Sequence, residues 1–378
     1  MKKVLIFTLV IVGIVSIGVW YRYGRSENIM EKIYVAAEGD GAINIIDSAT
    51  RQVIRTVDLS VGHEGGIVKF HPHNVVVAPD GKSVWITANA GKHEGHSQGL
   101  VNSAYAHGAN ESGVEPDEVI VLDPWSRDEI INRIETDIGA QLAHVAVSAD
   151  GSYAYVTAQK RGVVYKIDAK SKKIISEVSF AIGSEPHGLR ISSDGARAFI
   201  AVLKGKALGI LDLSKNTMTM TSVSLRGAAV QVGITPDGKY AVASLYDTKE
   251  LAVYDTQSGA VSYIALPASS KGPIQMYSTP DSKFFYLADQ GYYFSQPTSE
   301  WVYKIDIENR TVIKEIKAGQ APHGVVVSKD GKFAYITNLL SNDVSVIDAV
   351  ADTEVARVPV GKEPNGISIW NRDIGGTP

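Results

Sequence analysis

"EPHGLRISSDGARAFIAV", from Glu185 to Val202, has a close echo in "APHGVVVSKDGKFAYITN", from Ala321 to Asn338. In both stretches a Pro-His-Gly opens an apolar run, a DG turn ends that run, and a second apolar run follows. Short runs rich in Val, Ile and Tyr that are separated by such turns are typical of β-hairpins. The two stretches therefore indicate one hairpin unit that occurs more than once.

Two columns of aspartates show how often the unit recurs. The turn aspartate has six members: Asp80, Asp150, Asp194, Asp237, Asp281 and Asp330. Their successive separations are 70, 44, 43, 44 and 49 residues. An aspartate that closes a later strand has seven members: Asp47, Asp123, Asp168, Asp212, Asp255, Asp306 and Asp348. We interpret both columns as turn-forming residues, because Asp side chains accept hydrogen bonds from nearby backbone N–H groups, and not as metal or acid–base groups.

Each repeat contains four short apolar segments, and units of this length describe an all-β, seven-bladed β-propeller of four-stranded blades. The absence of a 3.6-residue period argues against the alternative, a helical solenoid. The chain begins in the middle of a repeat and ends with an opening strand alone, "KEPNGISIW" at residues 362–370. We predict that this C-terminal strand joins the N-terminal blade and closes the ring. The propeller is expected over residues 32–378, with an insertion at about residues 90–117.

The first 31 residues precede the repeats and contain an apolar segment. Val4 to Trp20 are seventeen uncharged residues behind Lys2 and Lys3. As a helix they would extend roughly 25 Å, near the lower limit for crossing a bilayer. The aromatic and basic residues that follow favour an uncleaved membrane anchor, with a cleaved signal peptide as the alternative. Either interpretation predicts an extracytoplasmic protein, periplasmic or at the cell surface, in contact with the membrane through residues 4–20 if uncleaved.

Composition excludes several classes of function. The chain has no cysteine, so disulfides, thiolate metal ligands and a covalently attached c-type haem are excluded. A net charge of −4 does not favour binding to the negatively charged backbone of nucleic acids, and we expect no nucleic-acid partner.

The residues "YVTA" at 155–158, "YITN" at 335–338 and "SNDVSVIDAVADTEVARVPVGKEPNG" at 341–366 resemble the YVTN-type seven-bladed propeller repeat. The resemblance covers nearly the whole chain beyond about residue 32. Related propellers in nitrous oxide reductases hold a copper cluster on their axis through histidines. Those of haem-d1 nitrite reductases and haem-maturation proteins use histidines at the same end of the channel. The resemblance thus implies a metal or haem near the axis.

The chain departs from those relatives at several positions. Val230, Ile274 and Asn365 stand where a histidine would complete the column, and no cupredoxin or cytochrome domain follows. These departures argue against a full copper cluster of the nitrous oxide reductase type.

All nine histidines fall in segments that strand order assigns to one face of the propeller, the face with the connections between blades. The expected metal ligands are His71, His73, His93, His96, His107, His144, His187 and His323, and His63 lies in a connection. Gln231, Gln275 and Asn365 complete the ring of polar side chains where the innermost strands begin, and are the expected cofactor contacts. Because innermost strands line the channel, these side chains should converge near the axis.

Imidazole suits copper, zinc, iron and nickel, so this cluster predicts copper, another transition metal or haem. The alternative is that each histidine only satisfies a nearby carbonyl. Metal affinity is expected to fall as the pH drops through the ordinary imidazole pKa near 6.5. Two classes of function stay open. One is a binding module for a small ligand or protein partner on the histidine-rich face, and the other is a metal- or haem-dependent oxidoreductase or cofactor-maturation protein.

A shorter loop enlargement from Asp289 to Trp301 belongs to the same face. Its aromatic residues Tyr292, Tyr293 and Phe294 are expected either to wall a ligand pocket or to pack over the hub.

Overall fold

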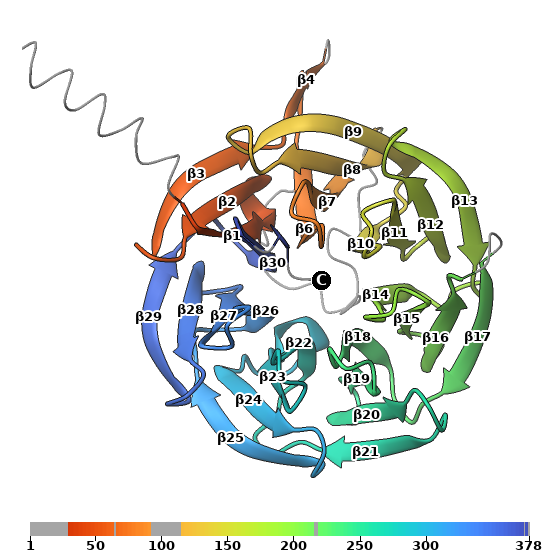
Figure 1. Cartoon of the computed structure of the whole chain (residues 1–378), viewed down its shortest axis with the longest axis vertical. Coiled ribbons are helices and arrows are strands. Elements are labelled where there is room, and N and C mark those ends of the chain that lie inside the picture. Colours follow the sequence, from red (N-terminus) through yellow and green to blue (C-terminus); the bar gives the residue numbers. More distant parts are fainter. Residues whose placement is uncertain (1–28, 64–65, 92–114, 215–217, 374, 377–378) are drawn as a thin grey trace, which may run out of the picture.

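The computed structural model describes residues 29–63, 66–91, 115–214, 218–373 and 375–376. Within them, seven sheets are arranged as blades around a central axis (Figure 1), which confirms the predicted propeller. The predicted N-terminal apolar helix and the core of the insertion lie outside the described residues. None of the described segments forms a helix that is long and apolar enough to cross a membrane.

Each blade is a four-stranded antiparallel sheet. From its innermost to its outermost strand, the first blade consists of β30 (Pro364–Asn371), β1 (Glu31–Ala37), β2 (Ala42–Asp47) and β3 (Gln52–Asp58), with β31 (Gly375–Gly376) added to β30. In the same direction, the second is β6 (Phe70–Val77), β7 (Val84–Ala90), β8 (Pro116–Asp123) and β9 (Glu129–Ile138). The third is β10 (Leu142–Val147), β11 (Tyr153–Ala158), β12 (Val163–Asp168) and β13 (Lys173–Ser179). The fourth is β14 (Pro186–Ile191), β15 (Arg197–Val202), β16 (Ala207–Asp212) and β17 (Thr219–Ser224).

The remaining blades follow the same order. The fifth is β18 (Ala229–Ile234), β19 (Tyr240–Leu245), β20 (Glu250–Asp255) and β21 (Val261–Ala265). The sixth is β22 (Pro273–Ser278), β23 (Phe284–Asp289), β24 (Trp301–Asp306) and β25 (Thr311–Lys317). The seventh is β26 (Pro322–Val327), β27 (Phe333–Asn338), β28 (Asp343–Asp348) and β29 (Thr353–Pro359). A hairpin of β4 (Val61–His63) and β5 (Gly66–Val68) and two short turns, η2 (Glu38–Asp40) and η3 (Tyr292–Phe294), complete the described elements.

Burial changes from the axis outward. Inner strands such as β10 and β26 are buried along their whole length, because neighbouring blades cover both faces. The outermost strands, for example β29, alternate exposed and less exposed residues, since one of their faces meets solvent. The hydrophobic core therefore lies between the blades, and the inner strands are fixed on all sides.

The ring closes as the sequence predicted. Strand β30, at the C-terminal end, pairs antiparallel with β1, from Glu31 opposite Asn371 to Ala37 opposite Pro364. β30 also contacts the innermost strands of the two flanking blades, β6 and β26. The first blade is thus built from both ends of the propeller sequence.

The aspartate columns act in turns, which confirms their structural interpretation. Asp194 accepts a hydrogen bond from the backbone N–H two residues later at 2.9 Å. Gly195 follows it with a φ of 70°, and Ser282 adopts a φ of 64° in the one turn that lacks this glycine. In the other column, Asp348 accepts the N–H two residues on at 2.9 Å. These carboxylates fix hairpins and lie away from the channel entrance.

A column of hydroxyl groups, which was not predicted, joins four of the seven blades to the next one. Thr157 accepts a hydrogen bond from the N–H of His144 at 2.9 Å and donates one to the carbonyl of His187 at 2.7 Å. Thr337 repeats this geometry between the N–H of Gly324 and the carbonyl of Asn365, both at 2.7 Å. The third residue of "YVTA" and "YITN" is this hydroxyl, so the repeat motif itself positions the strand starts that carry the histidines.

The Pro-His-Gly motif has a packing reason as well. A Cβ on Gly188 would lie 2.6 Å from the Cα of Gln231 on the next innermost strand, and one on Gly324 would lie 2.3 Å from the carbonyl oxygen of Asn365. The glycine after the histidine therefore lets adjacent innermost strands approach closely at the narrow hub.

Candidate functional site

Three buried histidines from successive blades meet at the channel entrance. His73 lies on β6, His144 on β10 and His187 on β14. Their ring centroids are 5.6 Å apart for His73 and His144, 5.5 Å for His73 and His187, and 5.0 Å for His144 and His187. One ring nitrogen from each lies within 4.8 Å of the other two. We call these three residues the histidine trio.

A local irregularity of the innermost strands brings the trio together. His144 stands one position later than His73 and His187 when each is counted back from its turn aspartate. The pairing of β10 with β11 shifts register between Leu142 and Val145, and that of β14 with β15 shifts between Pro186 and Leu189. Because a bulge redirects the side chains beside it, histidines from adjacent columns face the same point.

The ring of His187 is oriented by a backbone carbonyl. Its Nδ1 lies 2.9 Å from the carbonyl oxygen of Val230 on β18. A carbonyl can only accept, so Nδ1 carries the proton and Nε2 presents its lone pair. This pattern, in which the second ring nitrogen donates to a carbonyl, is the one that orients metal-binding histidines.

The other two rings contact polar side chains that belong to other blades. Gln231 places its Nε2 at 3.2 Å from Nε2 and 3.3 Å from Nδ1 of His144. His73 has the Nδ2 of Asn365 at 3.2 Å from its Nδ1, and the carboxylate of Glu38 at 3.7 Å. Glu38 in turn accepts a hydrogen bond from Asn365 Nδ2 at 2.6 Å. Gln231 and Asn365, two of the expected cofactor contacts, thus touch the trio.

Burial keeps the imidazoles of His144 and His187 neutral. Desolvation, followed by the nearby His73, lowers the pKa of His187 to about 3. Desolvation also lowers the pKa of His144 well below its ordinary value, and His187, His73 and Arg190 contribute in the same direction. Both rings therefore hold free lone pairs at neutral pH. The loss of metal affinity expected near pH 6.5 moves to lower pH for these two ligands.

The trio fits one ion with a small adjustment. Bonds of 2.0–2.1 Å in a tetrahedral site place ligand nitrogens roughly 3.3 Å apart. The nitrogens of the trio lie within 4.8 Å of one another, so the rings must approach one another on binding.

The remaining expected ligands do not join the trio. His323 accepts, at its Nδ1, a hydrogen bond from Gln290 Nε2 at 2.7 Å, and the edge of Tyr293 lies against its ring at a centroid distance of 5.6 Å. His71 places its Nδ1 2.9 Å from the backbone carbonyl oxygen of Glu38. The other expected ligands, His93, His96 and His107, lie outside the described residues.

The third expected cofactor contact, Gln275 on β22, is buried. Its Nε2 has no hydrogen-bond partner among the residues that the structure describes. It therefore remains available as a donor at the hub.

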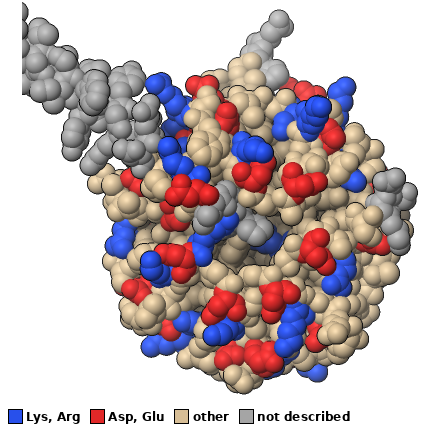
Figure 2. All heavy atoms as spheres, viewed as in Figure 1, with Lys and Arg blue, Asp and Glu red and all other residues tan. Residues whose placement is uncertain are grey.

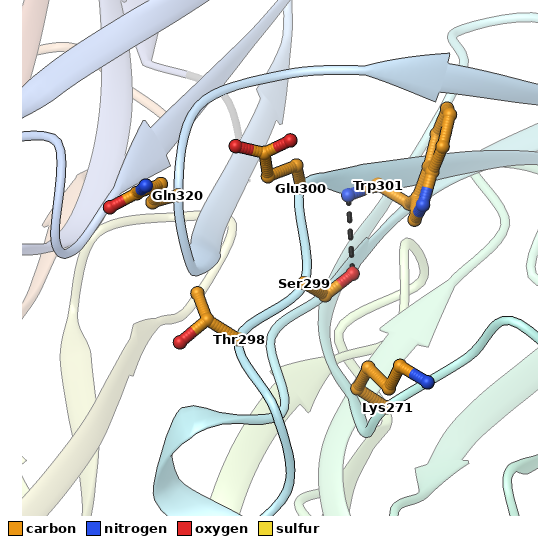
Figure 3. A pocket seen from close by; sticks show the side chains of 6 residues that line it. All are labelled: Lys271, Thr298, Ser299, Glu300, Trp301 and Gln320. Carbon is orange, nitrogen blue, oxygen red and sulfur yellow. Dashed lines mark hydrogen bonds between the residues drawn. The ribbon is translucent and has the colours of Figure 1, made fainter.

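The aromatic loop packs mainly over the hub. Phe294 of η3 stacks on Tyr246 with ring centroids 4.1 Å apart. Trp301 instead lines a hollow of about 180 Å³ (Figure 3), together with Lys271, Thr298, Ser299, Glu300 and Gln320. This hollow is smaller than ordinary ligand pockets, which begin near 300 Å³, and contains no histidine.

The acid sensitivity of the metal-free protein should report the buried rings. A histidine with a folded-state pKa below 6.5 takes up protons preferentially when unfolded, so its contribution to stability is complete above pH 6.5 and declines as the pH falls toward 3. The decline is about 1.4 kcal/mol per pH unit for each such histidine. We expect a flatter curve for a His144→Gln/His187→Gln variant between pH 4.5 and 6.5, measured by denaturant unfolding. Burial raises the pKa of Asp117 to about 6, so its contribution to stability changes with pH in the opposite direction. This contribution is the same in both proteins and cancels in the difference between their curves. Parallel curves for the two proteins would contradict neutral, buried histidines.

The fold and its channel define a seven-bladed propeller with histidines at the hub. The model of the YNCE-like beta-propeller family matches residues 145–375, and the chain belongs to this family.

Two curated relatives are similar over part of the chain. Antigen Lp49 of Leptospira interrogans is 28% identical over 196 residues, which are 48% of this chain and 41% of the antigen. The chain therefore matches less than half of that relative's length. An uncharacterised protein of Staphylococcus saprophyticus is 23% identical over 58% of this chain and 73% of its own length.

Solved structures share the fold at low identity. A hydrazine synthase chain of Kuenenia stuttgartiensis is 20% identical with a TM-score of 0.63, covering 79% of this chain and 92% of that one. The dihydro-heme d1 dehydrogenase NirN in complex with DHE is 15% identical with a TM-score of 0.58, covering 89% and 74%. A catalytically inactive virginiamycin B lyase from Staphylococcus aureus, with quinupristin, is 16% identical with a TM-score of 0.61, covering 84% and 96%. These likenesses establish the propeller fold alone.

Proposed function

We propose that the protein is a binding propeller that holds one transition-metal ion at its hub through His73, His144 and His187. The observation that carries this proposal is the convergence of three buried rings from three separate strands. Ligands fixed on strands lose little conformational entropy on binding, so such a site is largely preorganised. The carbonyl of Val230 supplies, for His187, the outer contact that holds metal-binding histidines in place.

The chemistry of the ligands favours copper(II) or zinc. Neutral imidazoles suit both ions, and copper(II) is the tightest-bound of the divalent first-row metals. The spacing favours an ion over haem, because rings with centroids 5.0–5.6 Å apart leave no plane between them for a macrocycle. An oxidoreductase that works on the same ion is the second candidate, and it would require copper because zinc has no redox chemistry.

Location and partners follow from the proposed anchor. We propose that Val4 to Trp20 export the chain and tether it to the membrane. The histidine-bearing face is then the surface that meets a soluble ligand or a partner. Figure 2 shows the ring hollowed at its centre, with acidic and basic side chains interspersed around it.

Metal titration tests the proposal. The exported part of the chain, freed of metal by chelation, should bind one equivalent of Cu²⁺ or Zn²⁺ with a Kd below micromolar and melt at a higher temperature when loaded. Calorimetry gives the stoichiometry, and the visible spectrum of the Cu²⁺ form reports nitrogen ligands. Binding weaker than micromolar, or a loaded protein with an unchanged Tm, would refute the metal site.

A further inference from the structure

One guanidinium near the trio, that of Arg190, has no acidic partner among the described residues. Arg190 lies on β14, three residues after His187, which is roughly 10 Å along the strand. Its Nη1 donates to the carbonyl of the preceding Leu189 at 3.0 Å. Within the described part of the chain, no carboxylate lies within ion-pair distance of this guanidinium. By contrast, Arg161, Arg226 and Arg357 each form an ion pair.

Arg190 faces the channel. Its strand β14 is the innermost strand of the fourth blade, and the innermost strands of the two flanking blades, β10 and β18, contact it on either side. Arg190 is nevertheless partly exposed, and on a strand covered in this way the open direction is toward the axis. The positive charge of Arg190 also contributes to the lowered pKa of His144 on the third blade.

Among the described residues, no negative charge compensates the guanidinium of Arg190. The imidazoles of His144 and His187 on the neighbouring strand starts bring no negative charge, since an imidazole is neutral or positive. Glu38, at the rim, is engaged with Asn365 and faces His73. A metal ion on the trio would add further positive charge. A cation that is taken out of bulk water without a counter-charge is costly, and a bound anion removes that cost.

We propose that a small oxygen-containing monoanion binds in the channel between Arg190 and the histidine trio, where it is the ligand offered to the metal. One guanidinium balances one negative charge, and its planar fork matches a planar group with two oxygens. Gln275, whose buried Nε2 has no partner among the described residues, supplies a further donor. The role of the anion as a metal ligand rests on the proposed function, whereas its contact with Arg190 does not.

Formate is the probe, with sulfate as a tetrahedral dianion for comparison. We expect calorimetry of the Zn²⁺-loaded protein to show formate binding that Arg190→Gln weakens at least about tenfold. The wild-type protein should bind sulfate with lower affinity than formate. Arg226→Gln is the matched control, because Arg226 is exposed and paired with Glu250. It should leave formate binding unchanged. Formate binding that is absent from the wild type, equal in Arg190→Gln, or tighter for sulfate would overturn the inference.

The metal-free protein separates this inference from the proposed function. If the wild type retains no metal, the metal proposal fails, yet formate should still bind the metal-free channel and depend on Arg190. If the metal binds but formate does not, only the inference fails. The melting temperature is a further readout, since removing an uncompensated cation should leave the Tm of anion-free Arg190→Gln unchanged or raised. A marked fall in Tm would mean that the protein itself already neutralises Arg190, and would refute the site.

Discussion

Replacing His144 and His187 together with alanine should abolish metal binding while the propeller stays folded. The change leaves His73 as the only ligand of the trio, and one imidazole cannot hold an ion at the affinity expected for three. We expect the affinity to fall by more than about a hundredfold, the upper range for losing only an outer contact. The fold should survive because the rings lie where the innermost strands begin, so that water can enter the space they leave at the hub.

The matched controls are other buried histidines that stand outside the trio. His71→Ala removes a ring held by the carbonyl of Glu38, and His323→Ala removes one held by Gln290. Both variants should retain the metal. Calorimetric titration and melting curves of all variants decide the matter. Retention of tight binding by the double variant, or its loss in the controls alone, would move the site elsewhere; a double variant that merely unfolds would favour purely structural histidines.

Much of the fold follows from the sequence because a propeller is built from a repeated local pattern. The turn aspartates, with their following positive-φ residue, mark the same hairpin in each blade, so counting them fixes the number of blades and the position of the insertion. Ring closure follows because the two columns differ by one member. The hairpin of β4 and β5 was not predicted, since it occurs once and has no counterpart in other repeats to reveal it.

The candidate site is less visible in the sequence because it depends on distance across the hub. Strand register predicts that His73, His144 and His187 lie near the axis. It does not predict which of the histidines at the hub contact one another. His323 is separated from the trio by its bond to Gln290, a residue of a loop that no repeat column includes. Glu38 and Arg190 were not predicted because their roles also depend on distances across the hub. The hydroxyl column was not predicted, although the threonine of "YVTA" is the residue that marks it in the sequence.

The largest effect on stability is expected from loss of ring closure. A chain that ends before Pro364 lacks β30, which pairs with one of the two edges of β1. It also loses the bond from Trp370 Nε1 to the carbonyl of Gly81 at 2.9 Å and the bond from the N–H of Val77 to Ser368 Oγ at 3.0 Å. Since β30 packs between the innermost strands of both flanking blades, its loss opens two interfaces as well as one sheet edge.

Because stability in a closed ring is shared between neighbouring blades, this loss should be cooperative. We expect the truncated chain to lack a native melting transition, which corresponds to losing most of the about 5–15 kcal/mol of a typical domain. A milder test keeps the chain intact: Ile369→Ala, at a fully buried position of β30, should cost about 2–5 kcal/mol. Ile313→Ala on the outermost strand β25, where the side chain is 47% exposed, should change stability by less than about 0.5 kcal/mol. Denaturant unfolding measures all three. A truncated chain that unfolds at the wild-type midpoint would contradict closure of the ring by β30, because the other six blades would then be stable without an intact first blade.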